Sequence, residues 1–400
     1  MMISRRLSSL LLLVAAFVPA TAQSLPAEIT ELRQRVATIR AEMTHITSAA
    51  DFAADIFTRD SAARFLISGV RNAGLRSEFD WHAGASPEFR DADDPAARGI
   101  LLLPILSWEI SGFAASMLVE RAQSAGRSVI IIGSLAGTPD SPLLRRVVPN
   151  GAPNGSREHA TINEVANLVA TWAFYAEFVA SATRHGWQPG IYVSHLVPRA
   201  DDSNYKIRFH TPPGARAVTP IPAGLLGNQY LDRIDSLLTL AAKPRHQAMV
   251  ARAADSLRAQ RTAGRRLFAA ACAYYLQTSL PGDSLASPFR AVRAQWETVQ
   301  PLLARGARAG DVVLWFGYGG YDCPHVEASN PLQQAGFKVV AVSDQLPAQL
   351  PANVLAPVPL SWHLPEQIGK VAFNAEGVGS ASSVEALLHY LWLRRLVGPP

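Results

Sequence analysis

The sequence predicts an α/β fold of two similar doubly wound units with parallel sheets, of the flavodoxin type, together with a long N-terminal helix. Strands that are apolar on both faces alternate with helical segments, which is typical of parallel sheets covered by helices on each side. The order strand, helix, strand occurs in both halves of the chain. A segment with four prolines, residues 211–224, separates the halves and is predicted to be a linker.

The first 22 residues predict a secretory signal peptide. Arg5 and Arg6 give a positive start, residues 10–18 form an apolar run, and Ala20-Thr21-Ala22 is a small-residue cleavage site. The run is shorter than the ~20 apolar residues that span a bilayer. We therefore expect an exported protein, periplasmic or secreted, with no stable membrane span once the signal is removed. The Arg pair leaves the Sec and twin-arginine routes both open.

The mature chain is expected to begin with a long helix that carries an apolar seam. The seam residues recur at alternating spacings of three and four: Ile29, Leu32, Val36, Ile39, Met43 and Ile46. Such an a/d seam packs on another helix. That helix belongs either to this chain or to a second copy, so the sequence leaves a homodimer open.

The first unit, residues 23–210, has three predicted central strands and three helices. The strands are expected at residues 64–69, 99–106 and 128–134, and the helices at residues 75–83, 113–125 and 161–184. Thr161 and Glu164 form a capping box at the start of the last helix. A further strand is expected at residues 190–194.

The second unit, residues 225–400, repeats this layout. Its helices are expected at residues 229–260, broken at Pro244, and at 380–396, with a helix or a loop and helix at 324–336. Its strands are expected at residues 265–271, 310–317 and 337–343. Residues 310–343 repeat the strand, helix, strand order of residues 99–134. The repeat indicates one α/β design used twice.

Composition and motifs exclude several function classes. The chain of 400 residues is 48% hydrophobic and 17% charged, and its net charge of +5 comes from Lys and Arg scattered among acids. Basic residues are not interleaved with aromatic residues, so we expect no nucleic-acid partner. The sequence has no P-loop, zinc spacing or serine nucleophile elbow, and we expect no cofactor and no metal. Cys272 and Cys323 match no metal or redox spacing, and export permits a disulfide without requiring it.

The order of the motifs resembles that of tandem sugar isomerase (SIS) domains. These motifs are the strand at residues 65–69 with its turn at 71–74, the G-D strand at 310–314, helices that end in Ala-Gly at 125–126 and 335–336, and the Ser-rich helix start at 379–383. The resemblance implies a sugar or sugar-phosphate ligand, held by hydroxyls and backbone N–H groups where strands end beside helix N-termini.

The polar turns place the expected ligand site in the first unit. The ligand-binding residues that the resemblance implies there are Arg71, Asn72, Ser107, Ser111, Ser134 and Thr161. The second unit looks degenerate as a phosphate site, because Tyr318 and Tyr321 stand in the matching turn. Glu109 in the first unit would itself repel a phosphate. A stacking platform for a neutral sugar at the two tyrosines is the competing placement of the site.

Two functions from different classes fit these residues. The first is an exported protein that binds a carbohydrate derivative without catalysis. The alternative is a sugar or phosphosugar isomerase or lyase with a carboxylate base in the first-half crevice. Glu78 and His82, four residues apart, share one helix face and are the catalytic candidates for that alternative. A solvated Glu–His pair on a surface helix is the other interpretation.

Overall fold

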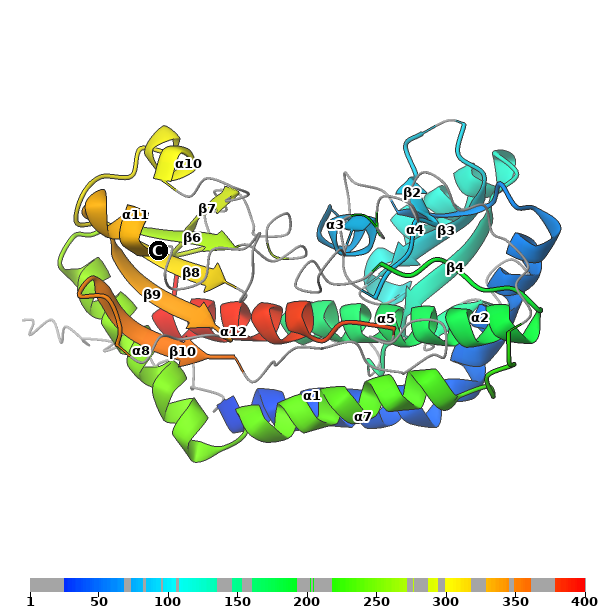
Figure 1. The fold of residues 1–400 in the computed structure, drawn as a ribbon, viewed down its shortest axis with the longest axis horizontal. Helices are drawn as coiled ribbons and strands as arrows, with labels where there is room; N and C mark the ends of the chain where they lie inside the picture. The colour runs from blue at the N-terminus through cyan, green and yellow to red at the C-terminus, as the bar shows by residue number, and fades with distance from the viewer. Residues whose placement is uncertain are drawn as a thin grey trace, which may run out of the picture.

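The computed structural model shows two α/β units, one from each half of the chain (Figure 1). The residues that it describes are 25–67, 73–81, 84–94, 96–105, 108–134, 146–152, 160–192, 202, 204, 218–271, 276, 287–293, 299–317, 329–344, 349–360 and 378–399. Cys272, Cys323, the signal segment and the tyrosine turn at residues 318–321 lie outside this set.

The first unit holds a five-stranded sheet in which all neighbouring strands are parallel. Its elements are α1 (Leu25–Ala41), α2 (Met43–Arg59), β1 (Arg64–Ile67), α3 (Ala73–Trp81), β2 (Phe89–Asp91), β3 (Gly99–Pro104), α4 (Trp108–Ser124), β4 (Ser128–Gly133), β5 (Val147–Pro149) and α5 (Ala160–Arg184). The strand order is β2-β1-β3-β4-β5, and Phe65 of β1 pairs with Ile100 of β3. This is the flavodoxin-type order that the sequence predicts.

The second unit repeats the same strand order. Its elements are α7 (Leu225–Ala241), α8 (Pro244–Thr262), β6 (Leu267–Ala271), β7 (Arg290–Arg293), α10 (Val299–Ala304), β8 (Val312–Gly317), α11 (Ser329–Gln334), β9 (Lys338–Ser343), β10 (Val354–Pro359) and α12 (Ser382–Val397). The order β10-β9-β8-β6-β7 is again wholly parallel. Pro244 begins α8, where its missing N–H leaves no intrahelical hydrogen bond unmade.

The repeat extends to the helices that precede each first strand. The pair α1–α2 stands before β1 as α7–α8 stands before β6, and α5 and α12 each follow the last strand of their unit. One expectation is wrong here, because the N-terminal segment is two helices that meet at Glu42 (φ −94°, ψ 17°) rather than one. The turn bends the chain so that Ile39 and Ile46, on either side of it, are both fully buried.

The apolar seam is buried within this chain. All six seam residues are at most 8% exposed, and α1 packs on α7 and α5. Contacts from Arg33 to Thr239 and from Arg40 to Asp232 show that α1 and α7 run antiparallel, because seven residues forward in one helix correspond to seven back in the other. The prediction that this seam packs on another helix is therefore confirmed, and the helix is intramolecular.

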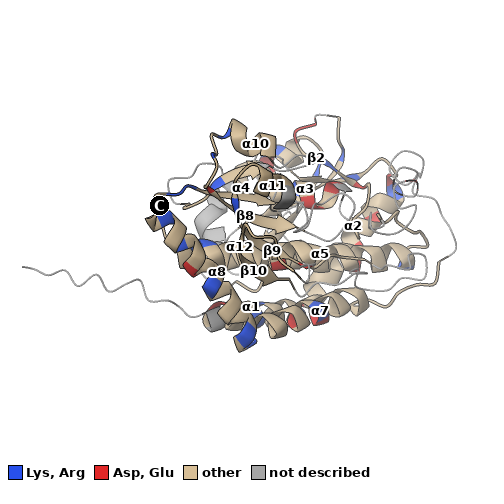
Figure 2. Cartoon of the chain, turned by 60° about the vertical axis from the view of Figure 1, so that its left-hand side comes forward, with Lys and Arg blue, Asp and Glu red and all other residues tan. Residues whose placement is uncertain are grey.

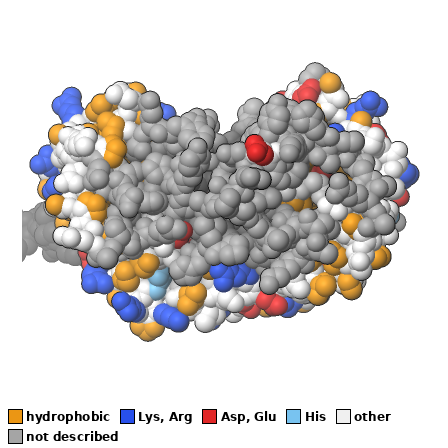
Figure 3. Space-filling view, viewed as in Figure 1, with side chains coloured by type: hydrophobic (Ala, Val, Ile, Leu, Met, Phe, Trp, Pro, Cys, Tyr) orange, Lys and Arg blue, Asp and Glu red, His pale blue; other side chains and the backbone are white. Residues whose placement is uncertain are grey.

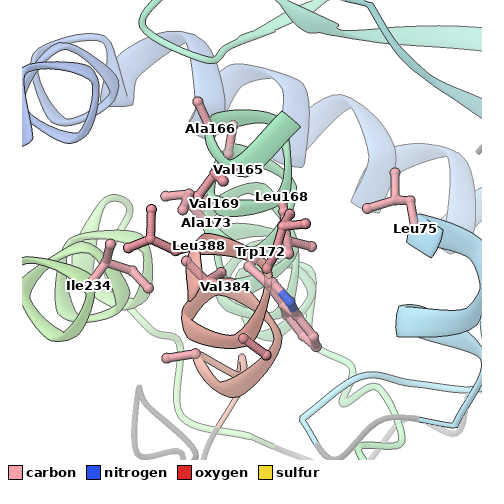
Figure 4. Packing of buried hydrophobic residues seen from close by; sticks show 14 of the residues in the cluster. Leu75, Val165, Ala166, Leu168, Val169, Trp172, Ala173, Ile234, Val384 and Leu388 are labelled. Atoms are coloured by element: carbon pink, nitrogen blue, oxygen red, sulfur yellow. The ribbon is translucent and has the colours of Figure 1, made fainter. Parts of the chain in front are cut away.

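Each sheet packs against two apolar cores. The core on one face is shared by both units, and the core on the other face belongs to that unit alone. In the first unit, alternate residues such as Leu66 and Leu101 pack under α4, whereas Phe65 and Ile100 face α2 and α5. The inner cluster continues into the second unit through α12 and α7. Figure 4 shows this junction, where Val384 and Leu388 of α12 lie beside α5 residues and Ile234 of α7.

Helix α5 is the central element of this shared core. Among the described residues, only its segment 162–184 is long and apolar enough to cross a membrane, and 94% of the most apolar part of this segment is buried inside the protein. Interior packing therefore accounts for its hydropathy. The end of the predicted linker is tied to α5, because Gly224 N and Gly227 N donate to the Glu177 carboxylate at 2.7 Å each.

The expected strand at residues 190–194 is not present in its described part. Residues 187–192 have no strand assignment, and Tyr192 instead exchanges two hydrogen bonds with the loop after α3: Gly84 N to Tyr192 O at 2.8 Å and Tyr192 N to Ala85 O at 2.7 Å. The described part of this apolar run therefore contacts the loop after α3 through these two hydrogen bonds and does not pair with a neighbouring strand.

Charged side chains on the described surface are mixed in sign. Figure 2 shows acidic and basic residues interspersed along α1 and α7, and Figure 3 shows the same mixture at the lower edge of the molecule. Ion pairs such as Arg40–Asp232 (2.8 Å) join neighbouring helices there. Such a surface favours solubility and offers no extended field for a polyanion on this face.

Candidate functional site

The strand order determines where a ligand crevice forms. In a 2-1-3-4-5 sheet the connections after β1 and β3 leave in opposite directions, and ligands bind outside the carboxyl ends of the strands at that point. In the first unit the described residues at this edge are Ile105 after β3, Ser134 after β4 and Asn150 after β5. In Figure 1 the arrowheads of β6 and β8 point from the second unit toward the first.

Neutral amide and hydroxyl groups hold this edge together. Asn167 of α5 donates from Nδ2 to Ile105 O (3.2 Å) and accepts at Oδ1 from Asn150 Nδ2 (2.7 Å). Asn150 Oδ1 in turn accepts from Ala152 N (2.9 Å), and Ser134 Oγ donates to Ala152 O (3.0 Å). The ends of β3, β4 and β5 are thereby fixed to one helix.

The amides belong to a polar stripe on an otherwise apolar helix. Asn163, Asn167 and Thr171 recur every four residues and so share one face of α5. Asn163 and Thr171 are buried, and Thr171 Oγ1 donates back to Asn167 O (2.7 Å). None of the three is among the predicted site residues, although three polar residues at four-residue spacing among alanines, valines and aromatics are a recognisable pattern.

Glu78 lies in the core beside this helix rather than at the surface. Its side chain is fully buried, and both carboxylate oxygens accept hydrogen bonds, Oε1 from Trp172 Nε1 (2.9 Å) and Oε2 from Ser383 Oγ (2.7 Å). Ser383 lies in the first turn of α12, whose N-terminus favours a nearby negative charge. Three elements from both halves therefore meet at one carboxylate.

The Ser-rich helix start at residues 379–383 is buried against the first unit. Gly379 N approaches Gly84 O at 3.4 Å, and Ser380, Ser382 and Ser383 are at most 2% exposed. Both glycines have positive φ, +87° at Gly84 and +86° at Gly379, and a Cβ on Gly84 would lie 2.8 Å from Gly379 N. The close approach leaves no room for a side chain at Gly84, and a Cβ on Gly379 would lie 3.0 Å from the ring of Tyr230.

Glu88 is a second buried carboxyl group, and it lies at the amino edge of the sheet, opposite the edge where ligands bind. It directly precedes β2, at the amino end of that strand. Burial raises the pKa of Glu88 more than the neighbouring Arg64 and Arg90 lower it, and burial together with Glu88 raises the pKa of Tyr175 well above its usual value. Its position makes Glu88 part of the core rather than of the ligand edge.

The structure places only some of the residues expected at the site. Ser134 lies at the carboxyl edge of the first sheet, as the topology requires, and Glu78 lies in the core between α3, α5 and α12. Ser111 and Thr161 lie in α4 and α5, and their side chains are outside the described set. Arg71, Asn72, His82 and Ser107 are outside it altogether. Within the part of the chain that is described, no three His, Cys, Asp or Glu side chains gather as a metal site would require.

Comparison with solved structures finds the same two-unit fold. A candidate sugar-binding protein from Salmonella typhimurium LT2 matches with a TM-score of 0.51 at 9% identity, over 92% of this chain and 99% of its own. A candidate phosphosugar isomerase from Silicibacter pomeroyi DSS-3 gives a TM-score of 0.48 at 13% identity, over 92% and 95% of the two chains.

No protein-family model matches the sequence, and no curated protein matches it either. The Salmonella protein shares the fold with this chain at 9% identity. At such identities the likeness establishes the fold and leaves the ligand to be argued from the site.

Proposed function

We propose that this chain is an exported protein that binds a sugar or a sugar derivative at the carboxyl edge of its first sheet, without catalysing a reaction on it. The observation that carries the proposal is the network of Ser134, Asn150 and Asn167 at the ends of three parallel strands. It orders uncharged hydrogen-bonding groups along the carboxyl edge of the sheet, from β5 to the end of β3, where the ligand point of this topology begins.

Neutral amides suit a polyhydroxyl ligand for a chemical reason. Each asparagine offers two N–H donors and a carbonyl acceptor in one plane, and a sugar hydroxyl both donates and accepts. The network already holds the asparagines in place, so little side-chain entropy remains to be lost when a ligand binds. The SIS-like fold supports the same ligand class.

The alternative, an isomerase or lyase with Glu78 as base, has less support. A general base must reach the proton that it removes. The Glu78 carboxylate is fully buried, and Trp172 and Ser383 occupy one oxygen each. The arrangement suits a structural anion at the start of α12.

Export to the periplasm or beyond is the second part of the proposal. It rests on the signal-peptide pattern of residues 1–22, which lies outside the described residues. The processed N-terminus of the protein, recovered from the periplasmic fraction of a bacterial host and read by mass spectrometry, should begin at Gln23. A chain that stays in the cytoplasm with its leader intact would contradict this part.

A binding screen tests the ligand. We expect at least one of a panel of sugars, amino sugars and their phosphates, at millimolar concentration, to raise the melting temperature, and NMR spectra of that ligand to stay unchanged during overnight incubation. The paired variant Arg71→Ala with Ser107→Ala should weaken binding about tenfold or more, since it removes a charge-assisted contact. The pair Tyr318→Ala with Tyr321→Ala should leave binding intact.

Each of the other results rejects a defined part of the proposal. Loss of binding in the tyrosine pair alone would place the site in the second unit. Conversion of the sugar would make the protein an enzyme. A panel without any thermal shift would reject sugar binding.

A further inference from the structure

Asn163 lies one helical turn beyond the ends of the strands. Asn167 contacts Ile105 O and Asn150, the first residues after β3 and β5, so it stands level with the carboxyl edge of the sheet. Further along α5, Phe174 and Phe178 pack on Phe65, near the start of β1, with ring centroids 5.7 and 4.7 Å apart. The helix therefore runs antiparallel to the strands.

This direction places Asn163 on the ligand side of the edge. Four residues correspond to about 6 Å along a helix axis, and side chains four apart lie on the same face. Asn163 consequently shares the face of Asn167 and projects outside the strand ends, where a 2-1-3-4-5 sheet takes its ligand.

The side chain of Asn163 is buried, but its carbonyl oxygen is not used by the protein. The residue is 3% exposed, and Oδ1 has no hydrogen-bond partner. A buried acceptor without a partner costs about 1–3 kcal/mol. At the ligand edge of the sheet, a bound group can supply the missing donor. Asn167, one turn away, has both ends of its amide engaged.

We infer that Asn163 Oδ1 accepts a hydrogen bond from a hydroxyl or amino group of the bound sugar and makes this end of the crevice selective for an uncharged or amino-bearing ligand group. The inference rests on the proposed function and specifies the ligand group that this part of the site recognises. A dianionic phosphate has no hydrogen to donate, and its oxygens would face the carbonyl oxygen with like partial charge. A phosphorylated carbon is therefore disfavoured at this position.

Three probes separate these contacts in a calorimetric titration: glucose, glucosamine and glucose 6-phosphate. Asn163→Ala removes the acceptor and should weaken the neutral and amino sugars about tenfold. Asn163→Asp keeps an acceptor and adds a negative charge. It should keep glucose within a few-fold of the wild-type affinity, strengthen glucosamine relative to glucose, and weaken glucose 6-phosphate about tenfold or more.

Asn353→Ala is the matched control. Asn353 Oδ1 is likewise buried without a partner, but the residue precedes β10, at the amino edge of the other sheet, and its Nδ2 donates to Phe337 O (3.2 Å). Its loss should change the melting temperature and leave all three affinities unchanged. A melting curve of each variant confirms that it folds, and the Asp variant serves as the test should the Ala variant not fold.

The outcomes are distinct. Wild-type binding that neither Asn163 variant alters overturns this inference and leaves sugar binding standing. Stronger binding of glucose 6-phosphate by Asn163→Asp overturns the assignment of an acceptor. A wild-type protein that binds none of the three probes, nor any other sugar, rejects the proposed function and this inference with it.

Discussion

At Glu78 a carboxylate is kept in the core by donors that come from two distant parts of the chain. Trp172 and Ser383 satisfy one oxygen each, and the first turn of α12 adds a favourable dipole. A buried charge persists only when its partners offset the lost hydration. The hydrogen bonds of Glu78 therefore help to hold α3, α5 and α12 together.

Replacing Glu78 by Gln should destabilise the protein by about 1.5–3 kcal/mol, because the amide retains only one acceptor oxygen for two donors. Urea denaturation followed by circular dichroism measures the loss. Glu120→Gln, on the exposed face of α4, is the control and should change stability by less than about 0.5 kcal/mol. Equal stability of the two variants would mean that the carboxylate does not hold the junction.

A histidine pair joins α8 to α12. His389 Nδ1 lies 2.7 Å from Glu385 O and therefore carries the proton, so Nε2 of His389 accepts from Nε2 of His246, also at 2.7 Å. Burial lowers the pKa of both rings to about 4, with the His389 ring adding to the effect on His246 and Glu385 opposing it. Both imidazoles are thus neutral at pH 7.

Acid should weaken this contact before it weakens most of the fold. In the unfolded chain both rings titrate near pH 6.5, so the unfolded state takes up protons first as the pH falls from about 6.5 to about 4. Because both rings have a folded pKa of about 4, stability should drop over that window by on the order of 5 kcal/mol. The double variant His246→Leu with His389→Leu should lose less over the same range in urea titrations, whereas His45→Leu, at an exposed ring, should behave as wild type. Identical pH profiles for all three proteins would contradict a neutral pair.

For single residues, the sequence indicates which side chains are unusual better than it indicates what they do. Glu78 stands out because His82 follows it by four residues, yet local spacing cannot reveal that Ser383, far along the chain, donates to it. Asn163 and Asn167 are not among the predicted site residues, because the periodicity of this segment predicts a helix without indicating what its polar face contacts. Long-range hydrogen bonds are set by tertiary packing, which one sequence does not display.

Among the elements, the central strands follow directly from the sequence and the edge strands do not. β3, β4, β8 and β9 are strands of six residues whose central residues are apolar and buried on both faces, a pattern that predicts buried parallel strands. The edge strands β2 and β5 have three residues each, and β10 contains two prolines, which only an edge tolerates. Short or proline-containing strands lack the periodicity on which prediction depends.

The contact between the α3–β2 loop and the entry to α12 should be intolerant of any side chain. Gly84→Ala meets two costs, a positive φ and a Cβ 2.8 Å from the Gly379 nitrogen. Gly126→Ala meets only the first, because nothing lies within 4 Å of its Cβ and φ is +70°. We expect a loss of about 1 kcal/mol for Gly126→Ala and at least about 2 kcal/mol more for Gly84→Ala.

Thermal denaturation of the two variants measures that difference. Because both variants carry the cost of a positive φ, the difference between them is the cost of the contact between the two halves. Similar melting temperatures for Gly84→Ala and Gly126→Ala would show that the loop moves aside at little cost, so that the two halves do not fix one another there.

At the scale of the whole molecule, the two sequence repeats form units that share a core. The shared cluster runs from the α1 seam through α5 and α12 to β6 and β8, whereas the separate clusters lie only on the outer faces of the two sheets. The central helices come from both halves, and α12 supplies Ser383 to Glu78 of the first unit. Sequence repeats show duplicated design, but they do not show whether the copies fold independently.

Such a core should make unfolding a single cooperative event. Removing either half would expose to water the apolar faces of α5, α7 or α12 that now pack together. The remaining half would lose the stabilisation that comes from burying that surface. We therefore expect one calorimetric transition for the mature chain, with equal calorimetric and van't Hoff enthalpies. Residues 23–210 and 225–400, produced separately, should show little near-ultraviolet circular dichroism and should regain it on mixing. Two resolved transitions, or a first half that folds and binds sugar alone, would show that the shared core is an interface between independent domains.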